Sequence, residues 1–146
     1  MPSCYQSRVI NVPIEKVWDT IKDFHDLSWC PSIVTSCDKI GELSGNEVGA
    51  KRLLNNVFEE KLLSVDTVRY TFSYSIDEAP ESPVSSKEVS NYVGVVTLLP
   101  ITQTDETFIE WKSSWESNSI EGEEFCHTLY VAMMADLNAT LTKRVS

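Results

Sequence analysis

Apolar side chains recur at helical spacing in the segment that follows Pro13. They are Ile14, Val17, Trp18, Ile21 and Phe24. Charged residues fill the positions between them, so the pattern predicts an amphipathic helix that begins at Pro13. Residues 4–12 predict a strand before this helix. Residues 25–33 (HDLSWCPSI) predict a short turn or helical segment after it, which ends at Pro31.

From Ile33 onward the period of the pattern changes from 3.6 residues to two. Residues 68–76 alternate strictly between apolar and polar side chains, which predicts a strand with one buried face. A second alternating run places Ile109, Trp111 and Trp115 on one side of a strand. Residues 92–99 between these runs are apolar on both faces, as in a central strand of a sheet.

Turn residues separate the predicted strands. Asn55-Asn56 predicts a tight turn, three glycines punctuate residues 41–49, and residues 79–86 (APESPVSS) predict a loop. The last element is a long helix from about Ser119 to Lys143. Short connections imply antiparallel neighbours, so we expect one curved sheet that grips this helix, an α+β fold.

Composition and charge narrow the range of partners. With 146 residues the chain is expected to form one domain over residues 1–146. Its 12 Lys+Arg and 22 Asp+Glu give a net charge of −10. Phosphate backbones and anionic membrane surfaces would repel such a chain, which argues against nucleic acid as a partner and against polybasic membrane attachment.

The cysteines and the N-terminus indicate the compartment. Cys4, Cys30, Cys37 and Cys126 form no C-x-x-C pair, and with two histidines they lack the spacing of a zinc site. Scattered cysteines in a chain of this length fit a reducing cytosol. The N-terminal MPSCYQSRVI lacks the pattern of a secretory signal, and no apolar stretch is long enough to span a bilayer. We therefore expect a cytoplasmic protein without membrane insertion, metal or cofactor.

Six segments of the chain, taken in order, resemble one family. They are VPIEKVWDTIKDFHDLSWCPSI, GAKRLL, EEKLLSVDTVRYTFSYSI, APESPV, NYVGVVTLLP and TFIEWKSSWE. Together they are similar to the polyketide cyclase/dehydrase family of the START-like, birch-pollen-allergen-like (SRPBCC) superfamily, especially its small stand-alone bacterial members. The resemblance implies a helix-grip fold: a curved seven-stranded antiparallel sheet, two short helices after the first strand, and a long C-terminal helix over an internal cavity. Members bind lipids, sterols, hormones or aromatic polyketides there, and some catalyse cyclisation or dehydration.

The apolar faces of the strands and of the long helix supply candidates for lining such a cavity. An aromatic or lipid-like ligand needs apolar walls with a few tyrosine hydroxyls and indole N–H groups. Trp29 is added because the resemblance places a cavity-wall tryptophan in that segment. The predicted ligand-binding residues are Trp29, Arg52, Glu60, Phe72, Tyr74, Tyr92, Trp111, Trp115, Tyr130, Met133 and Met134. The alternative is that these side chains simply fill the core.

Arg52 and Glu60 form a candidate charge pair. If Asn55-Asn56 is the tip of a hairpin, the two residues lie opposite or diagonal to one another on neighbouring strands. Both would then point to the apolar side, where a paired charge is tolerable and an unpaired one is costly. The resemblance adds that family members often carry an Arg and a Glu at these positions. The alternative is a solvated pair on a twisted edge.

The other titratable residues single out no catalytic dyad, and we expect His127 to be a surface or structural histidine rather than a ligand contact. His127 and Asp136 lie nine positions apart on the long helix, and Cys126 and His127 are adjacent there, so neither pair can be partners. His25 is a weaker candidate than the neighbouring Trp29. Phosphate-binding glycine loops and the common hydrolase signatures are missing from the sequence.

Three functions remain, and the first two use the cavity. The first is a carrier or sensor that binds a small hydrophobic or aromatic molecule in the cavity, with the loops 41–49 and 79–86 as its gate. The second is a cyclase/dehydrase-type enzyme in which Arg52, Glu60, Tyr74 or Tyr92 polarises carbonyls or moves protons. The small number of inward polar groups favours binding. A subunit with a filled core that binds a protein partner is a third possibility. We expect a monomer or a weak homodimer.

Overall fold

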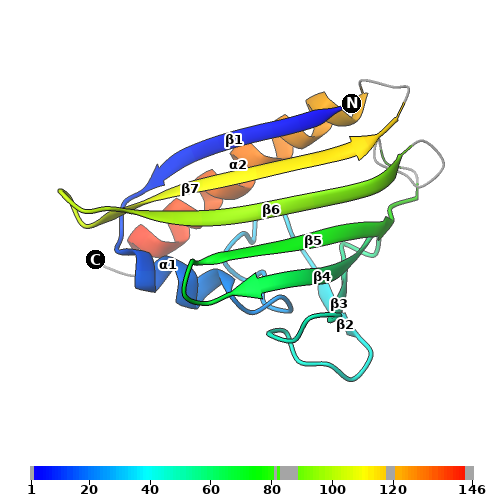
Figure 1. The fold of residues 1–146 in the computed structure, drawn as a ribbon, viewed down its shortest axis with the longest axis horizontal. Helices are drawn as coiled ribbons and strands as arrows, with labels where there is room; N and C mark the ends of the chain where they lie inside the picture. Colours follow the sequence, from blue (N-terminus) through cyan, green and yellow to red (C-terminus); the bar gives the residue numbers. More distant parts are fainter. Residues whose placement is uncertain (1, 81, 83–88, 118–120, 144–146) are drawn as a thin grey trace.

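One antiparallel sheet dominates the computed structural model, which describes residues 2–80, 82, 89–117 and 121–143. Within these residues the strands are β1 (Ser3–Ile10), β2 (Cys37–Ile40), β3 (Lys51–Leu54), β4 (Phe58–Asp66), β5 (Thr71–Glu78), β6 (Ser90–Ile101) and β7 (Glu106–Glu116). Their order in the seven-stranded sheet is β1-β7-β6-β5-β4-β3-β2 (Figure 1). The long apolar strand β6 is central, as its two apolar faces predict.

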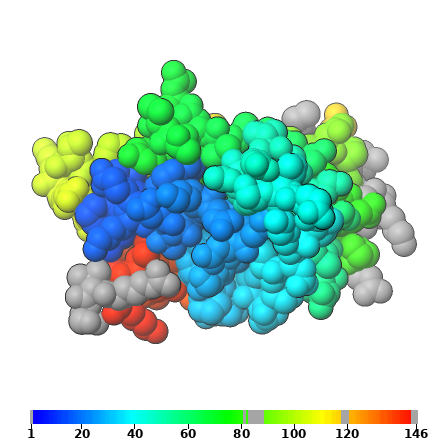
Figure 2. Space-filling model, turned by 90° about the horizontal axis from the view of Figure 1, so that it is seen from below, coloured from blue at the N-terminus to red at the C-terminus, as the bar shows by residue number. Residues whose placement is uncertain are grey.

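The helices lie on one side of this sheet. α2 (Glu121–Lys143) runs along β1 and β7, and α1 (Ile14–Ile21) follows β1 directly. The buried face of α2 carries Cys126, Tyr130, Met133, Met134, Leu137 and Leu141. Figure 2 shows the first third of the chain, coloured blue to cyan, covering the molecule beside the C-terminal part of α2. The predicted helix-grip fold is therefore confirmed.

The prediction of a second short helix after the first strand is wrong. Residues 24–34 form successive turns instead. Asp23 Oδ1 accepts a hydrogen bond from the backbone N–H of His25, and Asp26 Oδ1 accepts one from Ser28, each at 2.9 Å. Such bonds from a short side chain to the backbone two residues on favour turns over helix.

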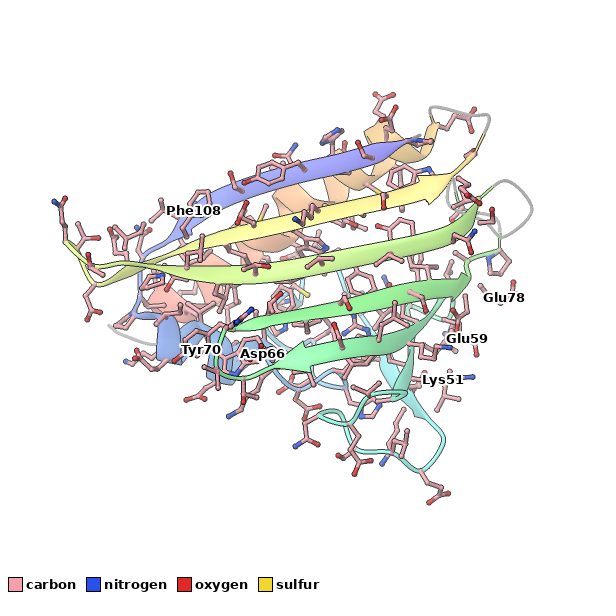
Figure 3. The ribbon with its side chains drawn as sticks, in the orientation of Figure 1. Lys51, Glu59, Asp66, Tyr70, Glu78 and Phe108 are labelled. Carbon is pink, nitrogen blue, oxygen red and sulfur yellow. The ribbon has the colours of Figure 1, made fainter. Side chains whose placement is uncertain are left out.

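The alternating pattern of residues 68–76 also predicts a strand that begins earlier than the observed one. β5 begins only at Thr71, and Val68 is 84% exposed. Asp66 Oδ1 accepts hydrogen bonds from the backbone N–H groups of Val68 and Arg69, each at 3.0 Å, and this turns the chain. Figure 3 shows Asp66 and Tyr70 together at this turn between β4 and β5. Tyr70 has a positive φ of 54° and packs edge-on against Trp18.

Candidate ligand-binding cavity

A cavity of about 40 Å³ lies between α2 and strands β3 to β7. It offers room for about three water molecules. Its walls are mostly apolar or aromatic. Their few polar groups belong mainly to one charged pair and three tyrosines. The lining residues are Ile33, Val34, Arg52, Leu54, Asn55, Phe58, Glu60, Tyr74, Ile76, Tyr92, Trp111, Phe125, Cys126, Leu129, Tyr130 and Met133.

The β3–β4 hairpin brings Arg52 and Glu60 together. Asn55 and Asn56 at its tip have φ of 54° and 58°, the left-handed conformation that asparagine tolerates and that tight hairpins require. The resulting register places Arg52 directly opposite Glu60. The guanidinium donates from Nε and Nη2 to one carboxylate oxygen, Oε1, at 2.8 and 2.6 Å. Both side chains are over nine-tenths buried, so the predicted inward-facing pair is present and the solvated alternative is wrong.

Further contacts hold the guanidinium in place. Nη1 of Arg52 donates to the carbonyl oxygen of Phe24 at 2.9 Å, and the guanidinium carbon lies 3.7 Å from the centre of the Phe24 ring. Burial raises the pKa of Glu60 above its usual range, and the charge of Arg52 opposes this rise. Since the positive and negative charges face one another, the polar side of the cavity is close to neutral overall.

A cluster of phenol hydroxyls lies beside this pair. The indole N–H of Trp111 donates to the hydroxyl of Tyr74 at 2.9 Å. The Tyr74 hydroxyl lies 3.4 Å from that of Tyr130, which is also hydrogen-bonded to the hydroxyl of Tyr92. Burial raises the pKa of all three tyrosines. These hydroxyls therefore stay protonated and can donate as well as accept hydrogen bonds.

Half-buried apolar residues form the mouth of the cavity. Phe58 on β4 stacks on Phe125 of α2, with ring centroids 6.0 Å apart and an interplanar angle of 23°. Asn55 fastens the neighbouring segment, since its Oδ1 accepts from the Thr35 N–H at 2.7 Å and its Nδ2 donates to the Ile33 carbonyl at 3.0 Å. The entrance thus lies between the β3–β4 hairpin, residues 33–34 and α2.

The described residues of the predicted gate loops do not line the cavity. No residue of the loop 41–49 lines the cavity, because that loop packs beside residues 23–24, where the Phe24 N–H donates to the Gly45 carbonyl at 2.9 Å. In the loop 79–86, the described residues 79, 80 and 82 are likewise absent from the lining. Residues 81 and 83–86 of that loop lie outside the described residues.

The predicted ligand-binding residues fall into three groups. Those that line the cavity are Arg52, Glu60, Tyr74, Tyr92, Trp111, Tyr130 and Met133. Trp29 and Phe72 line a smaller space beyond Arg52. Trp115 and Met134 line neither space, although both are buried. Trp115 stacks instead on Tyr92 at 5.3 Å, and Met134 follows Met133 on the helix and so points elsewhere.

The prediction missed most of the mouth. Ile33 and Val34 belong to no regular element, and the position of their segment depends on hydrogen bonds to Asn55. Phe125 and Leu129 were detectable, because each directly precedes a residue of the buried face, Cys126 or Tyr130, and so widens the apolar face of the long helix to one side by about 100°. Their partial burial at the edge of that face is the signal of a mouth.

The histidines hold chain segments together. A ring nitrogen of His25 donates to the carbonyl of Lys51 at 2.9 Å. Nδ1 of His127 accepts from Gln6 Nε2 at 2.8 Å and lies 3.3 Å from the sulfur of Cys4. Burial raises the pKa of the Cys4 thiol to about 12, so this cysteine is no activated nucleophile.

Asp136 of α2 also has a structural contact, since its carboxylate accepts a hydrogen bond from the backbone N–H of Ser32 at 2.9 Å.

Neither a metal site nor a membrane-spanning helix occurs in the part of the chain that the structure describes. No three His, Cys, Asp or Glu side chains come together there as ligands. The described helices are too short or too polar to cross a bilayer.

The sheet, the long helix and the cavity between them define a helix-grip protein, and comparisons with known proteins identify its family. Residues 1–144 match the family model described as polyketide cyclase/dehydrase and lipid transport. The chain belongs to this family. A search of the curated proteins found no match.

Solved structures share the fold. A protein of Nitrosospira multiformis is 48% identical, with 94% of each chain covered and a TM-score of 0.92. A protein of Bacillus thuringiensis is 23% identical over 95% of this chain and 98% of that one, with a TM-score of 0.77. The major latex-like protein 151 of Panax ginseng is 12% identical, with coverages of 94% and 95% and a TM-score of 0.78, which shows a shared fold.

Proposed function

We propose that this protein binds a small uncharged hydrophobic or aromatic molecule in the cavity beneath α2, as a carrier or sensor. The observation that carries the proposal is the combination of aromatic walls with a neutralised charge pair and protonated hydroxyls. Such a site favours an apolar body with one or two hydrogen-bonding groups. A charged ligand is disfavoured, because its charge would be buried without a counterion.

Ligand entry requires the cavity to widen. Pockets for drug-sized ligands occupy about 300–1,000 Å³, whereas the closed cavity holds about 40 Å³. The residues that can yield are at the mouth, where Phe58 and Phe125 are half-buried, and in the wall, where Met133 has a flexible side chain. The proposal therefore includes an opening of the Phe58–Phe125 stack when a ligand enters.

Exposure to a pool of apolar metabolites tests the proposal. The protein is incubated with the pool, separated from unbound molecules and extracted for mass spectrometry. The variant Leu129→Trp fills the mouth of the cavity. Its matched control, Val131→Trp, places the same side chain on the exposed face of the same helix. We expect a retained compound with the wild type and Val131→Trp that is lost with Leu129→Trp. Equal retention by all three proteins would refute the cavity as the binding site.

A second candidate function is supported by Glu60. A buried carboxyl with a raised pKa that lines a cavity beside tyrosine hydroxyls is suited to proton transfer, as a cyclase/dehydrase-type enzyme needs. If a retained compound is also converted, Glu60→Gln should reduce the rate of conversion by at least about a hundredfold. Retention of the compound by that variant would separate catalysis from binding.

A cytoplasmic location is part of the proposal. The four cysteines are free, and Cys4, Cys30 and Cys126 are buried, with thiol pKa values raised by burial to about 12, 12 and 11. Buried unpaired thiols are typical of proteins in a reducing compartment. We further propose that the protein acts as a monomer or a weak homodimer.

A further inference from the structure

A second, smaller space adjoins the main cavity, and its lining residues are buried except for Asp26, which is exposed. It holds about 10 Å³, close to the least that admits one water molecule. Arg52 and Trp111 line both spaces, so their side chains form the partition between the two. Phe72 and Ile109 supply apolar wall to this inner chamber.

Trp29 brings an unused hydrogen-bond donor to the inner chamber. Its side chain is 5% exposed, and its indole Nε1 has no hydrogen-bond partner among the described residues. The residue is fixed in place, because its carbonyl oxygen accepts a hydrogen bond from the Thr140 hydroxyl of α2 at 2.9 Å. A buried donor without an acceptor is costly. An acceptor atom inside the chamber would remove this cost.

Arg52 supplies donors from the partition itself. A guanidinium carries five N–H groups. Two of those of Arg52 donate to Glu60 and one donates to the carbonyl of Phe24. Asp26 also lines the chamber, but its Oδ1 already accepts the Ser28 N–H at 2.9 Å. The chamber is thus a small, mostly apolar space whose polar lining residues are the donor-bearing Trp29 and Arg52 and the carboxylate of Asp26.

We infer that the inner chamber is the end of the ligand site and takes one carbonyl oxygen of an uncharged aromatic or polycyclic ketone. This inference rests on the proposed function. The carbonyl would reach between Arg52 and Trp111 and accept hydrogen bonds from Trp29 Nε1 and Arg52, while the apolar body stays in the main cavity. A ketone fits better than a carboxylate, because the chamber has room for one oxygen and the charge of Arg52 is already neutralised by Glu60.

A matched pair of probes tests the inference. 2-Acetylnaphthalene carries the carbonyl, and 2-ethylnaphthalene has nearly the same shape without it. Each is titrated into ¹⁵N-labelled protein, and dissociation constants are taken from shifts of backbone and indole N–H resonances. The variants are Trp29→Phe and, as a control, Trp115→Phe. The control removes another buried indole N–H that has no partner among the described residues, and Trp115 lines neither space.

We expect wild-type protein to bind the ketone about fivefold more tightly than the hydrocarbon, the factor that one net hydrogen bond supplies. Trp29→Phe should lose this preference and Trp115→Phe should keep it. In the wild type, the ketone should shift the Trp29 indole N–H resonance and the hydrocarbon should leave it in place. This shift alone decides the question if Trp29→Phe fails to fold.

Two results would overturn the inference, and they differ in their meaning. Equal affinities with an unmoved Trp29 resonance would show a chamber that holds water only, and the proposed function would stand. If neither probe shifts any resonance of the cavity residues, the proposed function fails and the inference fails with it.

Discussion

Tyr74 lies directly across from Gly94 on the neighbouring strand, and its ring occupies the space where a side chain at position 94 would stand. A Cβ built on Gly94 would lie 2.4 Å from Cζ of Tyr74 and 2.6 Å from its hydroxyl oxygen. The glycine in the middle of β6 therefore lets the Tyr74 ring lie flat over the strand. This position brings the hydroxyl to Trp111 and Tyr130, so the polar cluster of the cavity depends on a missing side chain.

Gly94→Ala should displace Tyr74 and destabilise the protein. Overpacking of a buried site costs about 1–3 kcal/mol, and the hydrogen bond from Trp111 would be lost as well. Urea unfolding measures the loss. In a Tyr74→Ala background the same change should cost less than about 0.5 kcal/mol, because the ring is gone. Equal costs in the two backgrounds would show that the contact with Tyr74 is not the reason for the glycine.

Arg52→Leu should be more destabilising than the loss of both charges. The single change leaves the carboxylate of Glu60 buried without its partner, which costs about 3–5 kcal/mol. Arg52→Leu combined with Glu60→Leu removes the unpaired charge and should recover at least half of that loss. Free energies of unfolding in urea at pH 7 provide the comparison. A double variant that loses as much as the sum of the two singles would contradict the account of a coupled pair.

The raised pKa of Glu60 predicts a pH dependence of stability. Burial raises the folded-state pKa above the ordinary value of 4.5, so the folded protein holds this proton more tightly than the unfolded chain. The free energy of unfolding of the wild type should therefore fall, relative to Glu60→Gln, as the pH rises from about 4.5 through the folded-state pKa. Urea unfolding of both proteins at pH 4 to 7.5 measures the difference. A difference of opposite sign would show that Arg52 outweighs burial at this carboxyl.

The sequence predicted the parts of the site that follow from strand periodicity. The alternation around Arg52 and Glu60 and the Asn55-Asn56 turn were sufficient to place the pair opposite one another and facing inward. The mouth was not predictable in this way. The segment near Ile33 is positioned by hydrogen bonds to Asn55 and by Asp136 on α2, which are far from it in sequence.

Tertiary packing also explains the residues that were wrongly expected in the cavity wall. Trp115 shares the inward face of β7 with Trp111, but it lies near the end of the strand, where Gly122 of α2 approaches it closely. Cβ on that glycine would stand 3.1 Å from the indole ring. The start of the helix therefore seals this end of the fold, which periodicity along a single strand does not reveal.

Binding of a neutral fluorescent probe is the most direct test of the space beneath α2 as a ligand site. N-Phenyl-1-naphthylamine is titrated into the wild type and two variants. Leu129→Trp blocks the cavity, and Val131→Trp is the control, because Val131 is 51% exposed on the same helix. We expect saturable binding of one probe per chain to the wild type and to Val131→Trp. The affinity of Leu129→Trp should be at least about tenfold lower, a loss of roughly 1.4 kcal/mol. Absence of binding to the wild type, or equal binding to all three proteins, would contradict it.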